Sequence, residues 1–171
     1  MGVVYEDTAT HVRALQTYDY LLAHAGSEFE FQFSWWSFDL LQEARRAEDA
    51  ARIAEAADLV IFSIRLGKEL SRQLKAWIES WIAHRAGRPG AIAALFCPPH
   101  TETAGTNGRR AYLQAVAKNA GLDFLAHEAD LLLTAYFAEL DDLVHHAAPS
   151  GLLYQDAFDR PDSSPYWGVN G

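Results

Sequence analysis

The chain has 171 residues, is 50% hydrophobic and 12% aromatic, and carries a formal net charge of −9. This composition excludes a disordered chain, and the length predicts a single domain. Acidic residues outnumber Lys and Arg by 23 to 14, which argues against a nucleic-acid-binding surface. The single cysteine, Cys97, excludes an internal disulfide and a cysteine-based zinc cluster.

Residues 1–10 lack the basic and apolar segments of a secretory signal, and no run approaches the roughly 18 apolar residues of a membrane span. We therefore expect a cytoplasmic protein that has neither a membrane nor a nucleic acid as its partner.

The first third of the chain predicts two strands and a helix. Residues 3–6 form a short apolar strand, and Thr8 or Thr10 would cap a helix over 11–24. Residues 28–35 alternate aromatic with polar side chains, which predicts a strand with one buried and one wet face. A half-wet strand in an α/β protein belongs at the edge of the sheet.

The middle of the chain alternates helices with fully apolar strands. A helix is predicted over 37–57, followed by a buried strand over 58–64. Residues 68–85 form the strongest predicted helix. Its apolar stripe consists of Leu70, Leu74, Trp77, Ile78, Trp81 and Ile82, which we interpret as core packing, with a partner interface as the alternative.

The remaining segments continue this alternation. A strand over 91–96 leads into a loop over 100–107, a helix over 108–120, a weaker strand over 122–126 and a helix over 131–146. We place the end of the domain at residue 148. Residues 149–171 are rich in Pro, Gly and aromatic residues, which predicts a C-terminal aromatic extension packed on the domain or on a partner.

Five strands alternating with helices predict a three-layer α/β sandwich around a doubly wound, five-stranded parallel sheet. With right-handed crossovers and the second strand at an edge, the predicted strand order is 2-1-3-4-5. Ligands of such sheets bind at the carboxyl ends of the strands, so the loops at 6–10, 63–69 and 97–108 are the candidate site.

Two segments, ADLVIFS at 57–63 and LKAWI at 74–78, resemble flavodoxin-like NAD(P)H-dependent FMN reductases and quinone reductases. Residues 88–96 and 103–108 are similar to the fourth strand and to a second flavin-facing loop of that family, and the resemblance covers residues 3–126. It implies a flavodoxin-like fold. It also implies cofactor-binding positions at Thr8, Thr10, Ser63, Arg65, Gly67, Thr103, Gly105, Thr106 and Asn107.

The chain departs from that family in both principal loops. The family holds the FMN phosphate in a loop rich in glycine and hydroxyl groups, whereas the loop here carries Glu6 and Asp7 and no glycine. The flavin-ring loop at 63–68 lacks the usual proline and aromatic residue. We therefore predict a binding or regulatory module with an altered site and no cofactor. A divergent FMN-dependent NAD(P)H oxidoreductase is the alternative, and enzymatic activity is left open.

A second flavodoxin-shaped family, the response-regulator receiver domains, needs an acidic pair after the first strand, an Asp after the third and a Lys after the fifth. Glu6 and Asp7 supply only the first requirement. We do not expect aspartyl phosphorylation, although a degenerate receiver-like module stays open.

Several side chains have both an ordinary and a functional interpretation. We interpret Cys97 as a buried strand end rather than a nucleophile paired with His100. No metal site is predicted, because Glu6 and Asp7 fit an acidic surface loop better than a cation site. Arg109 and Arg110 are expected to be solvated, with a small anionic ligand as the alternative. We expect a homodimer.

Overall fold

The computed structural model describes residues 1–24, 32–67, 69–85, 87–97 and 108–128. Five strands form one sheet: β1 (Gly2–Tyr5), β2 (Ser34–Ser37), β3 (Leu59–Arg65), β4 (Ala91–Cys97) and β5 (Asp123–Glu128). Their order is β2-β1-β3-β4-β5, and every neighbouring pair is parallel. The predicted five-stranded parallel sheet and its strand order are confirmed.

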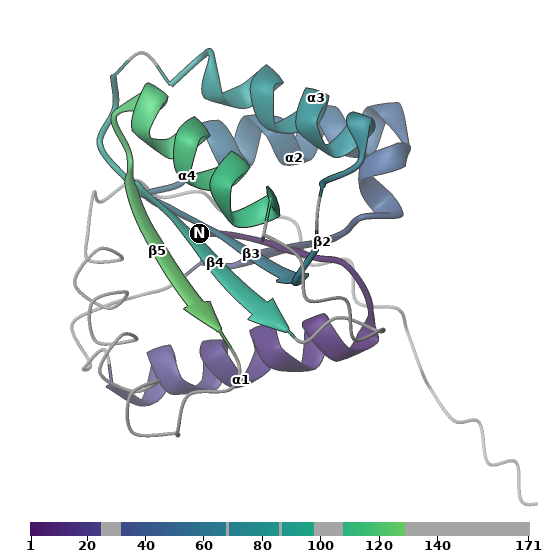
Figure 1. Cartoon of the computed structure of the whole chain (residues 1–171), viewed down its shortest axis with the longest axis vertical. Helices are drawn as coiled ribbons and strands as arrows, with labels where there is room; N and C mark the ends of the chain where they lie inside the picture. The colour runs from purple at the N-terminus through teal and green to yellow at the C-terminus, as the bar shows by residue number, and fades with distance from the viewer. Residues whose placement is uncertain (25–31, 68, 86, 98–107, 129–171) are drawn as a thin grey trace, which may run out of the picture.

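The helices cover both faces of this sheet. On one face lie α2 (Ala44–Ala56), α3 (Arg72–Ile82) and α4 (Gly108–Ala120), and on the other lies α1 (Thr8–His24) (Figure 1). The chain alternates between strand and helix because a parallel strand can be reached only by a crossover connection. The predicted three-layer α/β architecture is therefore present.

Strand β3 shows why the sheet is buried on both sides. Val60, Phe62 and Ile64 pack into the core beneath α2, α3 and α4, whereas Leu59 and Ile61 pack into the core beneath α1. All five side chains are 2% exposed or less. Successive strand residues point to opposite faces, so a continuous apolar run is what a central strand of a doubly wound sheet requires.

The edge strand differs from its predicted bounds. Strand β2 ends at Ser37 rather than at residue 35, because it pairs with the four-residue strand β1, whose Tyr5 is level with Ser37. Residues 28–31 of the predicted strand lie outside the described residues. Trp36 packs into the core on the α2 side, and Trp35 faces the α1 side. A Cβ atom at Gly2 would lie 2.8 Å from the Trp36 ring, so glycine makes room for this indole.

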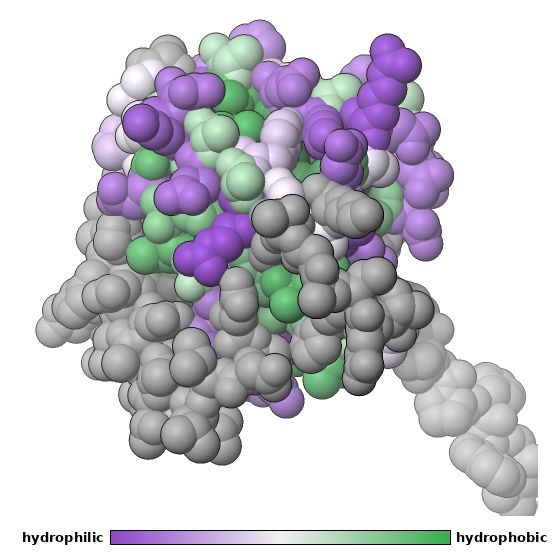
Figure 2. Space-filling view, viewed as in Figure 1, coloured by the Kyte–Doolittle hydropathy of each residue, from purple (hydrophilic) through white to green (hydrophobic). Residues whose placement is uncertain are grey.

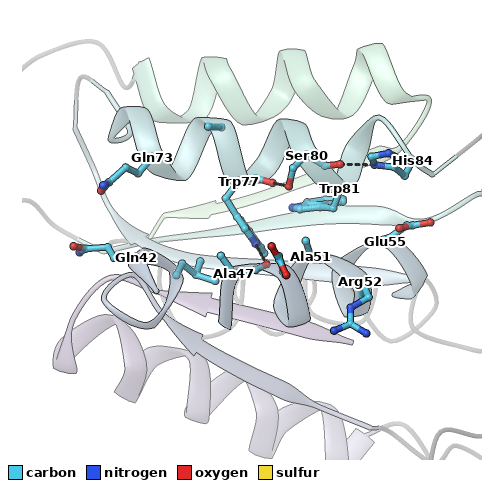
Figure 3. Close-up of a pocket in the computed structure, with 13 residues that line it drawn as sticks. Gln42, Ala47, Ala51, Arg52, Glu55, Gln73, Trp77, Ser80, Trp81 and His84 are labelled. Atoms are coloured by element: carbon cyan, nitrogen blue, oxygen red, sulfur yellow. Dashed lines mark hydrogen bonds between the residues drawn. The ribbon is translucent and has the colours of Figure 1, made fainter. Parts of the chain in front are cut away.

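Helix α3 begins later than predicted because Ser71 caps it. The Ser71 hydroxyl accepts a hydrogen bond from the Leu74 amide at 3.2 Å, which satisfies one of the donors at the start of the helix. Trp77 and Trp81 are buried, and the Trp77 indole N–H donates to the Ala47 carbonyl of α2 at 3.0 Å (Figure 3). Core packing of this aromatic stripe is confirmed. The predicted helix over 37–57 is divided into a short 3₁₀ helix (Leu40–Gln42) and α2.

Three predictions cannot be compared with the described part of the chain. The helix over 131–146, the domain boundary at 148 and the extension over 149–171 lie outside it and stay predictions. Within the described ranges, no helix combines the length and the apolar character needed to cross a bilayer.

A buried arginine joins the end of α2 to the start of β4. The Arg85 side chain is 4% exposed, and its guanidinium donates to the carbonyls of Ala54, Ala57 and Pro89 at 2.7–3.1 Å. The last carbonyls of a helix have no partner within the helix, so this side chain satisfies acceptors that would otherwise be buried without one. Helical periodicity does not reveal this role, because Arg85 lies three residues beyond Ile82, where α3 ends.

We predict that Arg85→Met lowers the free energy of unfolding by roughly 2–4 kcal/mol, because it leaves several buried carbonyls without donors. Urea unfolding followed by tryptophan fluorescence measures this loss. The matched control is Arg88→Met, which removes an exposed arginine three residues away and should change stability by less than about 0.5 kcal/mol. Equal stability of the two variants would contradict the assigned role.

Candidate functional site

The candidate site lies where β1, β3 and β4 end at the same edge of the sheet. The turn after β1, the segment after β3 and the first turn of α4 meet there. Strand β1 lies between β2 and β3, so the chain reverses its direction across the sheet at this point. In open α/β sheets this is the place where ligands bind.

The turn between β1 and α1 is closed by its own side chains. The Thr10 hydroxyl accepts hydrogen bonds from the amides of Glu6 and Asp7 at 2.9 and 2.8 Å, and it donates to the Asp7 carbonyl. In return, the Asp7 carboxylate accepts the Thr10 amide at 3.0 Å. This reciprocal arrangement resembles a capping box. Three amide donors at the start of α1 are therefore bound within the turn.

Ser63 joins this turn to the centre of the sheet. Its hydroxyl donates to the Thr10 carbonyl at 2.7 Å, and both residues are 0% exposed. The Glu6 amide also reaches the Ser63 carbonyl at 3.2 Å. Ser63 and Thr10 thus act as structural supports of the turn, and their hydroxyl protons are directed at backbone carbonyls.

Two ion pairs cover the turn. The Arg65 Nε donates to Asp7 at 2.6 Å, and an Arg109 guanidinium nitrogen donates to Glu6 at 2.7 Å. The four side chains are 16–29% exposed, so water screens both pairs only in part. The Arg65 amide also donates to the Glu6 carboxylate at 2.9 Å. We call these four residues the charge cluster.

Arg109 is fixed by several further contacts. Its Nε donates to the Glu69 carbonyl at 2.9 Å, and its amide donates to the Gly67 carbonyl at 3.3 Å. A Cβ atom at Gly67 would lie 3.0 Å from the Arg109 Nε, so glycine gives the guanidinium its space. Arg109 therefore ties the start of α4 to the segment after β3.

The charge cluster holds Asp7 in its ionised form. Burial alone would raise the pKa of this carboxyl, but the hydrogen bonds from Thr10 and Arg65 and the positive charge of Arg65 outweigh it. The pKa of Asp7 is lowered from 3.8 to about 2. Asp7 is a permanent anion near neutral pH, placed against the amides of a helix start.

Cys97 lies at the same edge of the sheet, but its thiol is not activated. The residue is 6% exposed, and burial raises the pKa of the thiol. A low pKa is what a nucleophilic cysteine needs, so the structure agrees with the interpretation of Cys97 as a buried strand end. His100 lies outside the described residues.

The structure brings together only some of the predicted cofactor-binding residues. Thr10, Ser63, Arg65 and Gly67 meet at the carboxyl edge, and Thr8 is the exposed first residue of α1. Thr103, Gly105, Thr106 and Asn107 lie outside the described residues. Within the described segments, no group of three or more His, Cys, Asp or Glu residues could hold a metal ion.

Sequence reasoning missed the partner of Arg109. We expected a solvated pair at Arg109 and Arg110, but the Arg109 side chain is 18% exposed and bound to Glu6. Glu6 and Asp7 do lie in a partly exposed turn, but each carboxylate is paired with an arginine. The signal was an acidic pair after the first strand, one arginine within the second candidate loop and another directly after the third, because a parallel sheet brings these positions to one edge.

A separate groove lies on the outer side of the helix layer. A groove of about 650 Å³ runs between α2 and α3, with Trp77 and Trp81 in its wall (Figure 3). None of the four residues of the charge cluster lines it, so it is distinct from the candidate site.

Comparisons with known proteins agree with this architecture. No protein-family model matches the chain, and no curated protein matches it in sequence. Among solved structures, the chain is similar to the solution structure of two-electron reduced flavodoxin from Megasphaera elsdenii. The match has a TM-score of 0.54 at 10% identity and covers 86% of this chain and 100% of that one. The fold is flavodoxin-like. At this identity, the likeness concerns the fold alone.

We predict that Asp7→Asn lowers the free energy of unfolding by roughly 1 kcal/mol at pH 7, because Arg65 and the Thr10 amide lose a charged acceptor. The folded-state pKa of Asp7 lies below its ordinary value, so its ionised form stabilises the protein above about pH 4. That contribution is lost as the pH falls towards about 2. Urea unfolding at several pH values should therefore show the two proteins converging in acid.

The control for this experiment is Asp49→Asn. Asp49 also pairs with an arginine, Arg52, but both side chains are at least 50% exposed on α2. This substitution should change stability by less than about 0.5 kcal/mol at every pH. A loss at Asp7 no greater than that at Asp49 would disprove the special environment of Asp7.

Proposed function

We propose that this flavodoxin-like protein is a binding or regulatory module that works without a flavin. The observation that carries the proposal is the closed turn after β1. In the family that the sequence resembles, this turn holds the FMN phosphate. Here the Asp7 carboxylate already accepts an amide at the start of α1 and the side chain of Arg65.

A phosphate does not fit the described residues of this turn. The amides of Glu6, Asp7 and Thr10 are bound within the turn, so a phosphate would have to displace these contacts. It would also meet two carboxylates, and a like-charge pair a few ångströms apart costs on the order of 4 kcal/mol at an effective dielectric near 20. The nearby arginines offer little compensation, because each already pairs with a carboxylate.

A recognition role accounts for the same features. The charge cluster ties three chain segments into one preformed surface at the carboxyl edge, and a preformed surface binds a partner with a smaller loss of conformational entropy. The buried polar groups of this edge serve the fold, because the Thr10 and Ser63 hydroxyls donate to carbonyls and the Cys97 thiol is buried. These contacts favour binding over covalent catalysis.

The alternative is a divergent FMN-dependent NAD(P)H oxidoreductase. The fold likeness supports it, because a flavodoxin is the kind of protein that this chain resembles in structure. The Gly- and Thr-rich segment over 103–107 supports it as well, since such a segment before a helix can hold an anion. FMN would then contact Thr8, Gly67 and that segment.

Titration with FMN, followed by flavin fluorescence, distinguishes the two functions. We expect the wild-type protein to be colourless when purified and to bind neither FMN nor riboflavin at about 100 μM ligand. The double variant E6A/D7A frees Arg65, Arg109 and the amide of Thr10, so it should bind FMN at least about tenfold more tightly than riboflavin, which lacks the phosphate.

The matched control is E48A/D49A, which removes two adjacent exposed acids of α2 and changes the net charge equally. It should bind FMN no better than the wild type. Stoichiometric FMN in the purified wild-type protein would refute the proposal and support the oxidoreductase. Failure of E6A/D7A to gain any preference for FMN would refute the role of the carboxylates.

A further inference from the structure

The groove between α2 and α3 has a buried hydrogen-bond donor in its wall that no described residue accepts. Two tryptophans of α3, Trp77 and Trp81, line this groove of about 650 Å³. The Trp77 indole N–H donates to the Ala47 carbonyl at 3.0 Å, whereas the indole N–H of Trp81 has no hydrogen-bond partner within the described ranges. Trp81 is 1% exposed, so bulk water does not supply the acceptor. Buried donors are nearly always paired, so this one indicates that an acceptor is missing.

The Trp81 N–H lies where a molecule in the groove would meet it. Figure 3 shows the nitrogen of this indole on the side of the ring that faces Trp77 and Ala51. On the neighbouring helix α2, Ala47 and Ala51 line the groove with small side chains, which leave room beside the two indoles. A molecule that packs between the helices here can bring an acceptor to the N–H. Burial of its apolar surface favours an insertion that a single water molecule does not achieve.

The shape of the groove fits a compact molecule. In Figure 3, Gln42 and Gln73 lie at one end of it, and Glu55 and His84 lie at the other. Figure 2 shows hydrophilic residues interspersed with apolar ones over the upper part of the molecule, where α3 and α4 lie. Small-molecule sites are concave and mainly apolar, with volumes of about 300–1,000 Å³ and a few polar groups that set the orientation of the ligand. The groove matches this description.

The charges around the groove favour an uncharged acceptor. Glu48 and Glu55 of α2 line it, and both would repel a carboxylate or a phosphate. Arg52 lines it as well, but its guanidinium is paired with Asp49. An indole N–H donates and does not accept, so its partner must carry a lone pair, as a carbonyl oxygen does.

We propose that this groove binds a small, uncharged aromatic carbonyl compound. Its carbonyl oxygen accepts the Trp81 N–H, and its ring packs against the two indoles, whose centroids are 6.0 Å apart and whose planes are tilted by 59°. Tilted and offset contacts of this kind are those that aromatic rings prefer. The site shares no residue with the charge cluster, so the inference is independent of the proposed function.

Three related probes test the site on the full chain. Acetophenone is an aromatic ketone, ethylbenzene has a methylene group in place of its carbonyl, and benzoate has a charged oxygen in place of its methyl group. In proton–nitrogen NMR spectra, we expect acetophenone to move the Trp81 indole N–H proton further downfield than ethylbenzene does. It should bind with a Kd of about 1 mM or lower, and at least about fivefold more tightly than either other probe. The resonance is assigned by its absence from Trp81→Phe, which should bind acetophenone and ethylbenzene equally.

The matched variants Ala51→Leu and Ala56→Leu test the location. Both alanines belong to α2, but Ala51 lines the groove, whereas Ala56 is exposed and does not line it. Ala51→Leu fills the groove, so it should weaken acetophenone binding at least about tenfold, and Ala56→Leu should bind like the wild type. The proposal is overturned if acetophenone leaves the Trp81 resonance in place, if ethylbenzene or benzoate binds as tightly, or if the two leucine variants bind alike.

Discussion

The ion pairs Arg65–Asp7 and Arg109–Glu6 determine what the carboxyl edge of this sheet can do. The acids come from the turn after β1, and the arginines come from the end of β3 and the start of α4. Each pair is largely shielded from water, so separating it would leave a partly buried charge without its partner. The charged groups of this edge are therefore paired with one another at the place where open α/β sheets bind their ligands.

The charge cluster depends on the rest of the fold. Parallel strands bring the ends of β1 and β3 to one edge, and Ser63 in β3 fixes the turn through the Thr10 carbonyl. Asp7 then takes the position in which an external anion would meet the helix start. Its lowered pKa and the satisfied amides have the same cause, which is the set of donors gathered around one carboxylate. This arrangement supports a protein that recognises partners with a preformed surface.

The sequence predicted most of the fold and less of the site. The continuous apolar run of β3 and the helical spacing of Trp77 and Trp81 in α3 are strong local signals, so these elements and the core followed from them. The strand order followed from the half-polar edge strand and right-handed crossovers. The charge cluster is different, because Glu6 and Arg109 are 103 residues apart and no local pattern relates them. The hydrogen bonds of Arg85 could not be predicted either, because their acceptors are backbone carbonyls, which every residue has.

The two sides of the molecule have different physical characters. The polar groups of the carboxyl edge are paired with one another, whereas Val12, Leu15 and Leu22 of α1 are apolar and exposed.

The most direct test of the charge cluster is an NMR titration of the Asp7 carboxyl carbon. Its resonance is assigned by comparison with Asp7→Asn. If Arg65 and Thr10 hold Asp7 as described, the Asp7 carboxyl titrates with a midpoint near pH 2, and its resonance does not move when FMN is added at neutral pH. A midpoint near pH 4, the ordinary value for an aspartate, would contradict it, as would a resonance that shifts on addition of FMN.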